Sequence, residues 1–324
     1  MRGHRWVGLG AVAVVACAAG VAIGAAPLAL PDIGRGLLGA GGPAATVVRE
    51  LRLPRVVLGF LIGGSLSVSG AALQALIRNP LAEPYLLGLS GGAALGAVAA
   101  IALGLPGAWS VPLAAFAGTL LVLALVYRLS LIEGRRLEPH VLVLAGVVMS
   151  ALTGALVTAV LVLADAARLK NAYTWLLGGL ESASWPAVLL FAGYAALPLG
   201  LLVLRSRTLD LLALGDEPAR HLGADPDRAR REVYLATGLL TAAAVAACGM
   251  IGFVGLIVPH AVRRLWGPLH RALLPAAFVL GGSFLVLADV LARSVARPLE
   301  LPVGVVTALI GVPLFAVLLR RSLT

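Results

Sequence analysis

The stretch LRLPRVVLGFLIGGSLSVSGAALQALIRNPLAEPYLLGLSGGAALG, residues 51–96, consists of two long apolar runs with a short polar segment between them. The first run, 53–77, is long enough as a helix to cross the roughly 30 Å hydrocarbon core of a bilayer. In the polar segment, 78–84, Pro80 and Pro84 prevent one helix from continuing into the next. This stretch therefore predicts two membrane-spanning helices joined by a stiff turn.

The rest of the chain has the same character, with 60% hydrophobic residues, 12% charged residues and a mean hydropathy of +1.00. These values are typical of an integral membrane protein. Apolar runs, of which the eighth is short for a span, occupy residues 6–29, 53–77, 85–104, 107–129, 139–163, 186–204, 232–249, 250–262, 271–292 and 302–319. Uninterrupted apolar runs satisfy their backbone as helices, whereas a barrel needs alternating segments. We predict an all-α polytopic membrane protein, a single domain over 1–324, with ten transmembrane helices in two five-helix halves, the second inverted.

Basic residues predict how the chain is oriented in the membrane. With the N-terminus in the cytoplasm, the inner loops collect most of the 25 Lys and Arg residues, among them Arg128, Arg135, Arg136 and six between Arg205 and Arg231. We therefore expect both termini in the cytoplasm, and we interpret the net charge of +10 as a topology signal rather than as nucleic-acid binding. The alternative, that the first run is a cleaved signal peptide, conflicts with its length and with this charge asymmetry.

A polar segment from Arg205 to Glu232 interrupts the second half of the chain. It holds twelve charged residues, and each Asp or Arg at bilayer depth would cost about 2.5–3.5 kcal/mol, so it lies outside the membrane. Two short helices are predicted at about 208–223, with Asp210 and Asp216 as N-caps and with Gly215 and Gly223 as stops. An apolar stripe on these helices, Leu211, Leu214 and Leu222, either lies on the bundle or docks a cytoplasmic protein.

Three stretches resemble a known family. EPARHLG, 217–223, is similar to the E-A-A-x-x-x-G loop of ATP-binding-cassette importer permeases, with Pro218 in place of the first Ala. Residues 51–96 closely resemble the second and third spans of the FecCD family, which imports iron–siderophore, haem and vitamin B12. GFVGLIVPHAVRRL (252–265) and LADVLARSVARPLELPVGVVTALIGVPLF (287–315) resemble the carboxyl-terminal signatures of that family. The resemblance covers nearly the whole chain.

The resemblance implies a type II importer permease in the cytoplasmic (inner) membrane of a prokaryote. The implied partners are a second copy of the chain, two cytoplasmic ATPase subunits, a periplasmic or lipid-anchored substrate-binding protein and membrane lipid. We expect an iron chelate as cargo, with haem or cobalamin as alternatives. The chain carries no G-x-x-x-x-G-K-[ST] phosphate loop, so ATP and Mg²⁺ are expected on the partner ATPase. We expect a transport subunit rather than an enzyme, without catalytic residues, bound cofactor or metal.

The resemblance also implies three groups of functional residues. Contact with the ATPase is expected from Leu211, Leu214, Asp216, Glu217, Arg220, Leu222 and Gly223. The inner mouth of the path is expected at Asn79 and Leu81, with Glu138 and His140 of the next inner loop. Arginines at the outer ends of two spans either snorkel to the interface or form a basic rim for an acidic binding protein; they are Arg52, Arg55, Arg293 and Arg297, of which the first three match the family.

Asp289 is the one acid placed clearly inside a predicted span. An acid in a membrane span suggests a proton relay, which would favour a proton-coupled secondary transporter. However, Arg293 follows four residues later, one helical turn away, where the two side chains can pair. We therefore predict a structural ion pair near the outer interface.

Overall fold

The computed structural model describes residues 2–24, 28–39, 42–132 and 136–323, so that Arg135 lies outside the described part of the chain. Each of the ten apolar runs corresponds to a helix: α1 (Arg2–Ala22), α4 (Leu53–Ile77), α5 (Leu89–Ala102), α6 (Ser110–Leu129), α7 (Pro139–Leu163), α9 (Trp185–Leu204), α12 (Pro226–Cys248), α13 (Val254–Trp266), α14 (His270–Ala292) and α15 (Val303–Leu323). Within the described residues, seven helices are long and apolar enough to cross a membrane. The shorter helices are α5, α13 and the apolar part of α15, Val303–Val317. The predicted all-α polytopic fold is confirmed.

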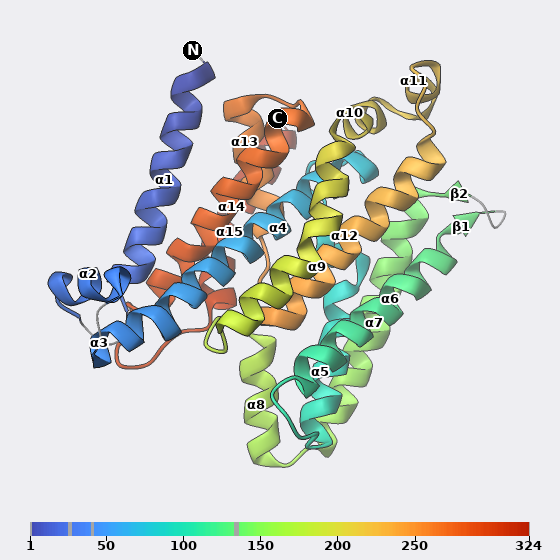
Figure 1. The fold of residues 1–324 in the computed structure, drawn as a ribbon. Coiled ribbons are helices and arrows are strands. Elements are labelled where there is room, and N and C mark those ends of the chain that lie inside the picture. Colours follow the sequence, from blue (N-terminus) through green and yellow to red (C-terminus); the bar gives the residue numbers. More distant parts are fainter. Residues whose placement is uncertain (1, 25–27, 40–41, 133–135, 324) are drawn as a thin grey trace.

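Short elements lie at the two ends of the bundle. One end carries α10 (Ser206–Leu214) and α11 (Asp216–His221), together with the start of α1 and the end of α15 (Figure 1). We call it the coupling end. The opposite end carries α2 (Leu30–Leu38), α3 (Pro43–Thr46) and α8 (Ala166–Leu176) (Figure 1). The remaining elements are a π-helix η1 (Val47–Arg52), a 3-10 helix η2 (Pro84–Leu87) and a hairpin of β1 (Leu131–Ile132) and β2 (Arg136–Leu137), in which Leu131 is opposite Leu137.

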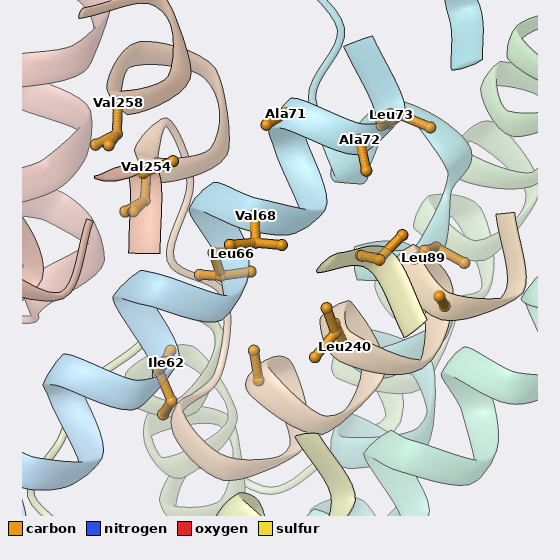
Figure 2. Close-up of a cluster of buried hydrophobic side chains, with 14 of the residues drawn as sticks. Ile62, Leu66, Val68, Ala71, Ala72, Leu73, Leu89, Leu240, Val254 and Val258 are labelled. Atoms are coloured by element: carbon orange, nitrogen blue, oxygen red, sulfur yellow. The ribbon is translucent and has the colours of Figure 1, made fainter. Parts of the chain in front are cut away.

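Helix α4 is the centre of the bundle. It is buried along most of its length, whereas only 22–28% of the residues in the spans of α1, α6, α7 and α9 are buried. Its neighbours α9, α12, α13 and α14 all come from the second half of the chain. Figure 2 shows Val254 and Val258 of α13 on one side of α4 and Leu240 of α12 on the other. The first half of the chain thus contributes the helix around which the second half packs.

Glycines in α4 permit this close packing. A Cβ added to Gly70 would lie 1.8 Å from the carbonyl oxygen of Gly255 in α13, and one added to Gly63 would lie 2.3 Å from the carbonyl oxygen of Gly281 in α14. Membrane helices associate through such backbone contacts because no hydrophobic driving force acts between helices in lipid. The small residues of this span therefore serve helix packing.

Candidate functional site

The coupling segment, 208–223, forms the two short helices that the sequence predicts, and both predicted stops are confirmed. Gly215 and Gly223 have φ angles of +114° and +82°, which glycine adopts without strain. The predicted N-caps are wrong, because α10 begins a turn earlier than expected and Asp216 is already the first residue of α11. Asp210 lies within α10 and accepts hydrogen bonds from His270, whereas Asp216 accepts one from Arg230.

The apolar residues of the coupling segment divide between the bundle and the surface. Leu209 and Leu212 are buried against the bundle, and Leu211 is partly exposed. Leu214 and Leu222 are 64% and 58% exposed. The segment therefore lies on its own bundle through one set of leucines and leaves another set free for a partner.

A groove of about 400 Å³ lies between α10 and the start of α12. Leu211 and Leu222 contribute apolar surface to it, while Arg207, Arg228 and Glu232 contribute charge. Arg228 and Glu232 pair with each other at 2.9 Å, so part of this charge is already neutralised. Apolar and charged side chains thus line this groove together, so that a partner bound there would need to match both.

Charged residues of the coupling segment mainly hold the segment in place. Asp216 is bound by Arg230, whose side chain is only 4% exposed, and it lies 3.8 Å from Arg78 at the end of α4. Arg230 also donates to the backbone oxygen of Leu137 in β2, at 3.4 Å. Asp216 is therefore an anchor of α11, and its expected contact with the ATPase stays a prediction. Glu217 is exposed, and Arg220 pairs with Asp227 at 3.4 Å.

At the opposite end, the predicted ion pair is part of a larger buried network. Asp289 lies 2.9 Å from Arg293, as the i, i+4 spacing predicts, and 2.8 Å from Arg55. Arg55 also pairs with Glu300 at 2.9 Å. Side chains of Arg55, Asp289 and Arg293 are 12%, 2% and 3% exposed. The pairing of Asp289 with Arg293 is confirmed, and Glu300 is a member that the sequence did not suggest.

Two arginines, Arg293 of this network and Arg52, hold the end of α1. Arg52 donates to the carbonyl oxygens of Val21 and Ala22 at 2.7 and 2.9 Å, and Arg293 donates to that of Gly20 at 3.1 Å. Cations are favoured at a helix C-terminus, where carbonyl groups lack helical partners.

Of the two alternatives for the four arginines, an exposed basic rim does not fit three of them. Arg52 and Arg293 are buried and Arg55 is nearly so, because two acids and the end of α1 satisfy their guanidinium groups. Arg297 alone of the four is exposed. Docking of a binding protein at this end stays a prediction.

The four residues expected at the inner mouth lie in two separate places, the turn after α4 and the start of α7. In the turn after α4, the Asn79 side-chain oxygen accepts from the backbone N–H of Leu81 at 2.9 Å. Glu138 immediately precedes α7, and His140 is exposed in its first turn. The structure thus joins Asn79 and Leu81 to each other by a hydrogen bond. A role of the four residues as a gate stays a prediction.

Three polar side chains that we did not single out fix the turn after α4. Gln74 accepts from Arg263 of α13 at 2.5 Å and donates to the carbonyl oxygen of Ala82 at 3.2 Å. Glu83 accepts at 2.5 Å from the backbone N–H of Phe253, in the non-helical break between α12 and α13. Burial raises the pKa of the Glu83 carboxyl, although the hydrogen bond from Phe253 opposes the shift. In the sequence, Gln74 could have been singled out because it is the one amide side chain in the apolar run 53–77.

Comparison with known proteins places these features in a family. The model of the FecCD transport family matches residues 12–321. The cobalamin import system permease BtuC of Halobacterium salinarum is 45% identical, with 86% of this chain and 74% of the relative covered. The hemin transport system permease HmuU of Yersinia pestis is 42% identical, with 84% of this chain and 83% of the relative covered.

A solved structure has the same fold over nearly the whole chain. It is described as an inward-facing conformation of a metal-chelate type ABC transporter, has 32% sequence identity and superposes with a TM-score of 0.87. The alignment covers 97% of this chain and 98% of the other. From the family match and these relatives, we conclude that the chain belongs to the FecCD transport family and is a multi-pass membrane permease of an ABC importer.

Proposed function

We propose that this permease imports an iron chelate across the cytoplasmic membrane as a homodimer, with ATP hydrolysed by two partner subunits. The observation that supports the cargo class most is the likeness to a metal-chelate type transporter along the whole chain. Relatives named for hemin and cobalamin also belong to importers of metals held in large organic ligands. Metals held in large organic ligands are therefore the class of cargo common to these proteins. Within this class we propose an iron chelate, and cobalamin is the main alternative.

The coupling end is proposed to face the cytoplasm. Most of the basic loop residues lie on elements at this end, including Arg78, Arg136 and the arginines of 205–231. Short loops rich in Arg and Lys remain on the cytoplasmic side of a membrane. Leu214 and Leu222 are then presented to the ATPase, and the end with the arginine network faces a substrate-binding protein.

In the proposed mechanism of alternating access, the ATPase pair and the binding protein favour different conformations of the permease. Closure of the ATPase pair would move the coupling segment, while docking of the binding protein at the opposite end would favour another state. A proton-coupled mechanism is less well supported, because the one acid within a span, Asp289, is engaged in ion pairs with Arg55 and Arg293.

The cargo is tested by uptake into vesicles that contain the permease with its ATPase and binding protein. We expect ATP-dependent accumulation of a radiolabelled ferric hydroxamate, tested beside hemin and cyanocobalamin at equal concentration. Vesicles loaded with ADP are the control and are expected to accumulate none. Accumulation of cyanocobalamin alone would overturn the iron-chelate proposal while leaving the importer class intact.

The orientation is tested by cysteine labelling of permease expressed without its ATPase. With Cys17 and Cys248 replaced by Ala, we expect Arg35→Cys in α2 to react with a membrane-impermeant maleimide in intact cells. Glu217→Cys in α11 should react only after permeabilisation. Both positions are exposed, so access to the reagent depends on the side of the membrane. Labelling of Glu217→Cys in intact cells would show that the coupling end is outside.

A further inference from the structure

The first turn of α14 receives its cap from another helix. Leu269, the residue that precedes α14, makes no side-chain capping bond. Asp210 of α10 provides the acceptor instead: its Oδ1 accepts from the backbone N–H of His270 at 2.9 Å and lies 2.6 Å from His270 Nδ1. The His270 side chain is 4% exposed and that of Asp210 is 25% exposed. A carboxylate is favoured at a helix N-terminus, where backbone N–H groups lack partners.

The charge on Asp210 is stabilised by this contact. Burial acts to raise the pKa of Asp210, but the hydrogen bonds from the His270 side chain and backbone outweigh it and lower the pKa below its usual value. The carboxylate therefore remains charged at neutral pH and keeps α10 attached to the start of α14.

Helices α14 and α4 are interlocked in the middle of the bundle. A Cβ on Gly281 would lie 1.9 Å from Ser67 Oγ and 2.5 Å from the Gly63 carbonyl oxygen. At the opposite end the two helices are joined again, through the 2.8 Å pair of Arg55 and Asp289. Close-packed interfaces transmit displacement because they have few voids to absorb it. A displacement of α14 therefore carries α4 with it.

The two halves of the coupling segment have different polar anchors on the bundle. Helix α10 packs against α4, α12 and α14, and Asp210 is its polar anchor to α14. Helix α11 is held to α12 through Asp216 and the buried Arg230. Gly215, with a φ angle of +114°, separates them. The second link of α11, from Asp216 to Arg78 of α4, is 3.8 Å long and partly exposed, so it contributes little.

We propose that Asp210 is a positioning residue that transmits the movement of α10 to the interlocked pair of α14 and α4. This pair then connects the coupling end with the ion network around Asp289. The proposal rests on the proposed contact between the coupling segment and an ATPase. The ATPase at the coupling end and the binding protein at the opposite end would then act on the same pair of helices. Binding of either one would change the affinity of the permease for the other by the same factor.

The test uses the permease with its ATPase and binding protein in vesicles. Asp210→Ala is expected to leave ATPase copurification and basal ATP hydrolysis unchanged, because Leu214 and Leu222 remain. Stimulation of hydrolysis by the binding protein should fall about tenfold, within the usual range of coupling between sites. Asp210→Asn keeps an oxygen acceptor and should recover most of the stimulation. Arg231→Ala, an exposed charged position near the start of α12 that does not line the groove, is the control and should behave as wild type.

A double-mutant cycle separates transmission from local damage. Glu300→Gln weakens the network at the opposite end, and its effect on stimulation should be strongly non-additive with that of Asp210→Ala. Additive effects, wild-type stimulation of Asp210→Ala, or its loss of ATPase binding would each overturn the proposal. Full ATPase binding by Leu214→Asp would instead show that the proposed contact surface is wrong.

Discussion

Replacing Gly70 with valine is expected to prevent the permease from folding. The new Cβ would lie 1.8 Å from the Gly255 carbonyl oxygen and 2.7 Å from the Gly255 Cα. Overpacking a core typically costs about 1–3 kcal/mol when side chains can adjust, and more is expected here because the clash is with backbone. We expect almost no monodisperse protein in size-exclusion chromatography after detergent extraction.

Gly193→Val in α9 is the matched control for this change. Gly193 is also a helical glycine, but nothing lies within 4 Å of an added Cβ, so near wild-type yield and melting temperature are expected. A monodisperse Gly70→Val variant with the wild-type melting temperature would contradict the close approach of α4 and α13.

The double change Leu214→Asp with Leu222→Asp is expected to separate the permease from its ATPase. Both leucines are more than half exposed, so the isolated chain should fold as before. Fully burying a leucine contributes about 1.5–3 kcal/mol, so loss of two such contacts should weaken binding by roughly 100-fold or more. The measurement is copurification of the ATPase beside ATP-dependent uptake, both of which should be lost.

Arg220→Ala tests whether apolar burial rather than surface charge dominates this contact. Arg220 already pairs with Asp227, and its side chain is 49% exposed. Exposed ion pairs typically contribute about 0–1 kcal/mol, so we expect a decrease in ATPase affinity of less than about fivefold. If Arg220→Ala dissociated the ATPase while the leucine variants retained it, the contact would be electrostatic.

The features predictable from sequence are those that depend on residues near one another in the chain. The spans follow from apolar runs because every helix that crosses a bilayer needs them. Gly215 and Gly223 mark helix ends, and Arg293 lies one turn after Asp289 in the same helix. Each of these inferences needs only the geometry of a helix and the apolar nature of the lipid bilayer.

Contacts between distant residues could not be predicted in this way. Glu300 lies far along the chain from Arg55, and nothing in the sequence indicates that it would neutralise an arginine expected on the surface. Asp210 has the residue type and position of an N-cap, yet it caps α14 rather than its own helix. In both cases local spacing gives the chemistry of the side chain but not its partner.

The central place of α4 also constrains how the permease is made. Helices enter the membrane as the ribosome produces them, N-terminal spans first, whereas α4 packs against α9, α12, α13 and α14. Until those helices are synthesised, the glycine-rich surfaces of α4 have only lipid or the insertion machinery beside them. Formation of the core is therefore a late event in biogenesis, and a nascent chain that stops after α7 contains the central helix without the neighbours that hold it.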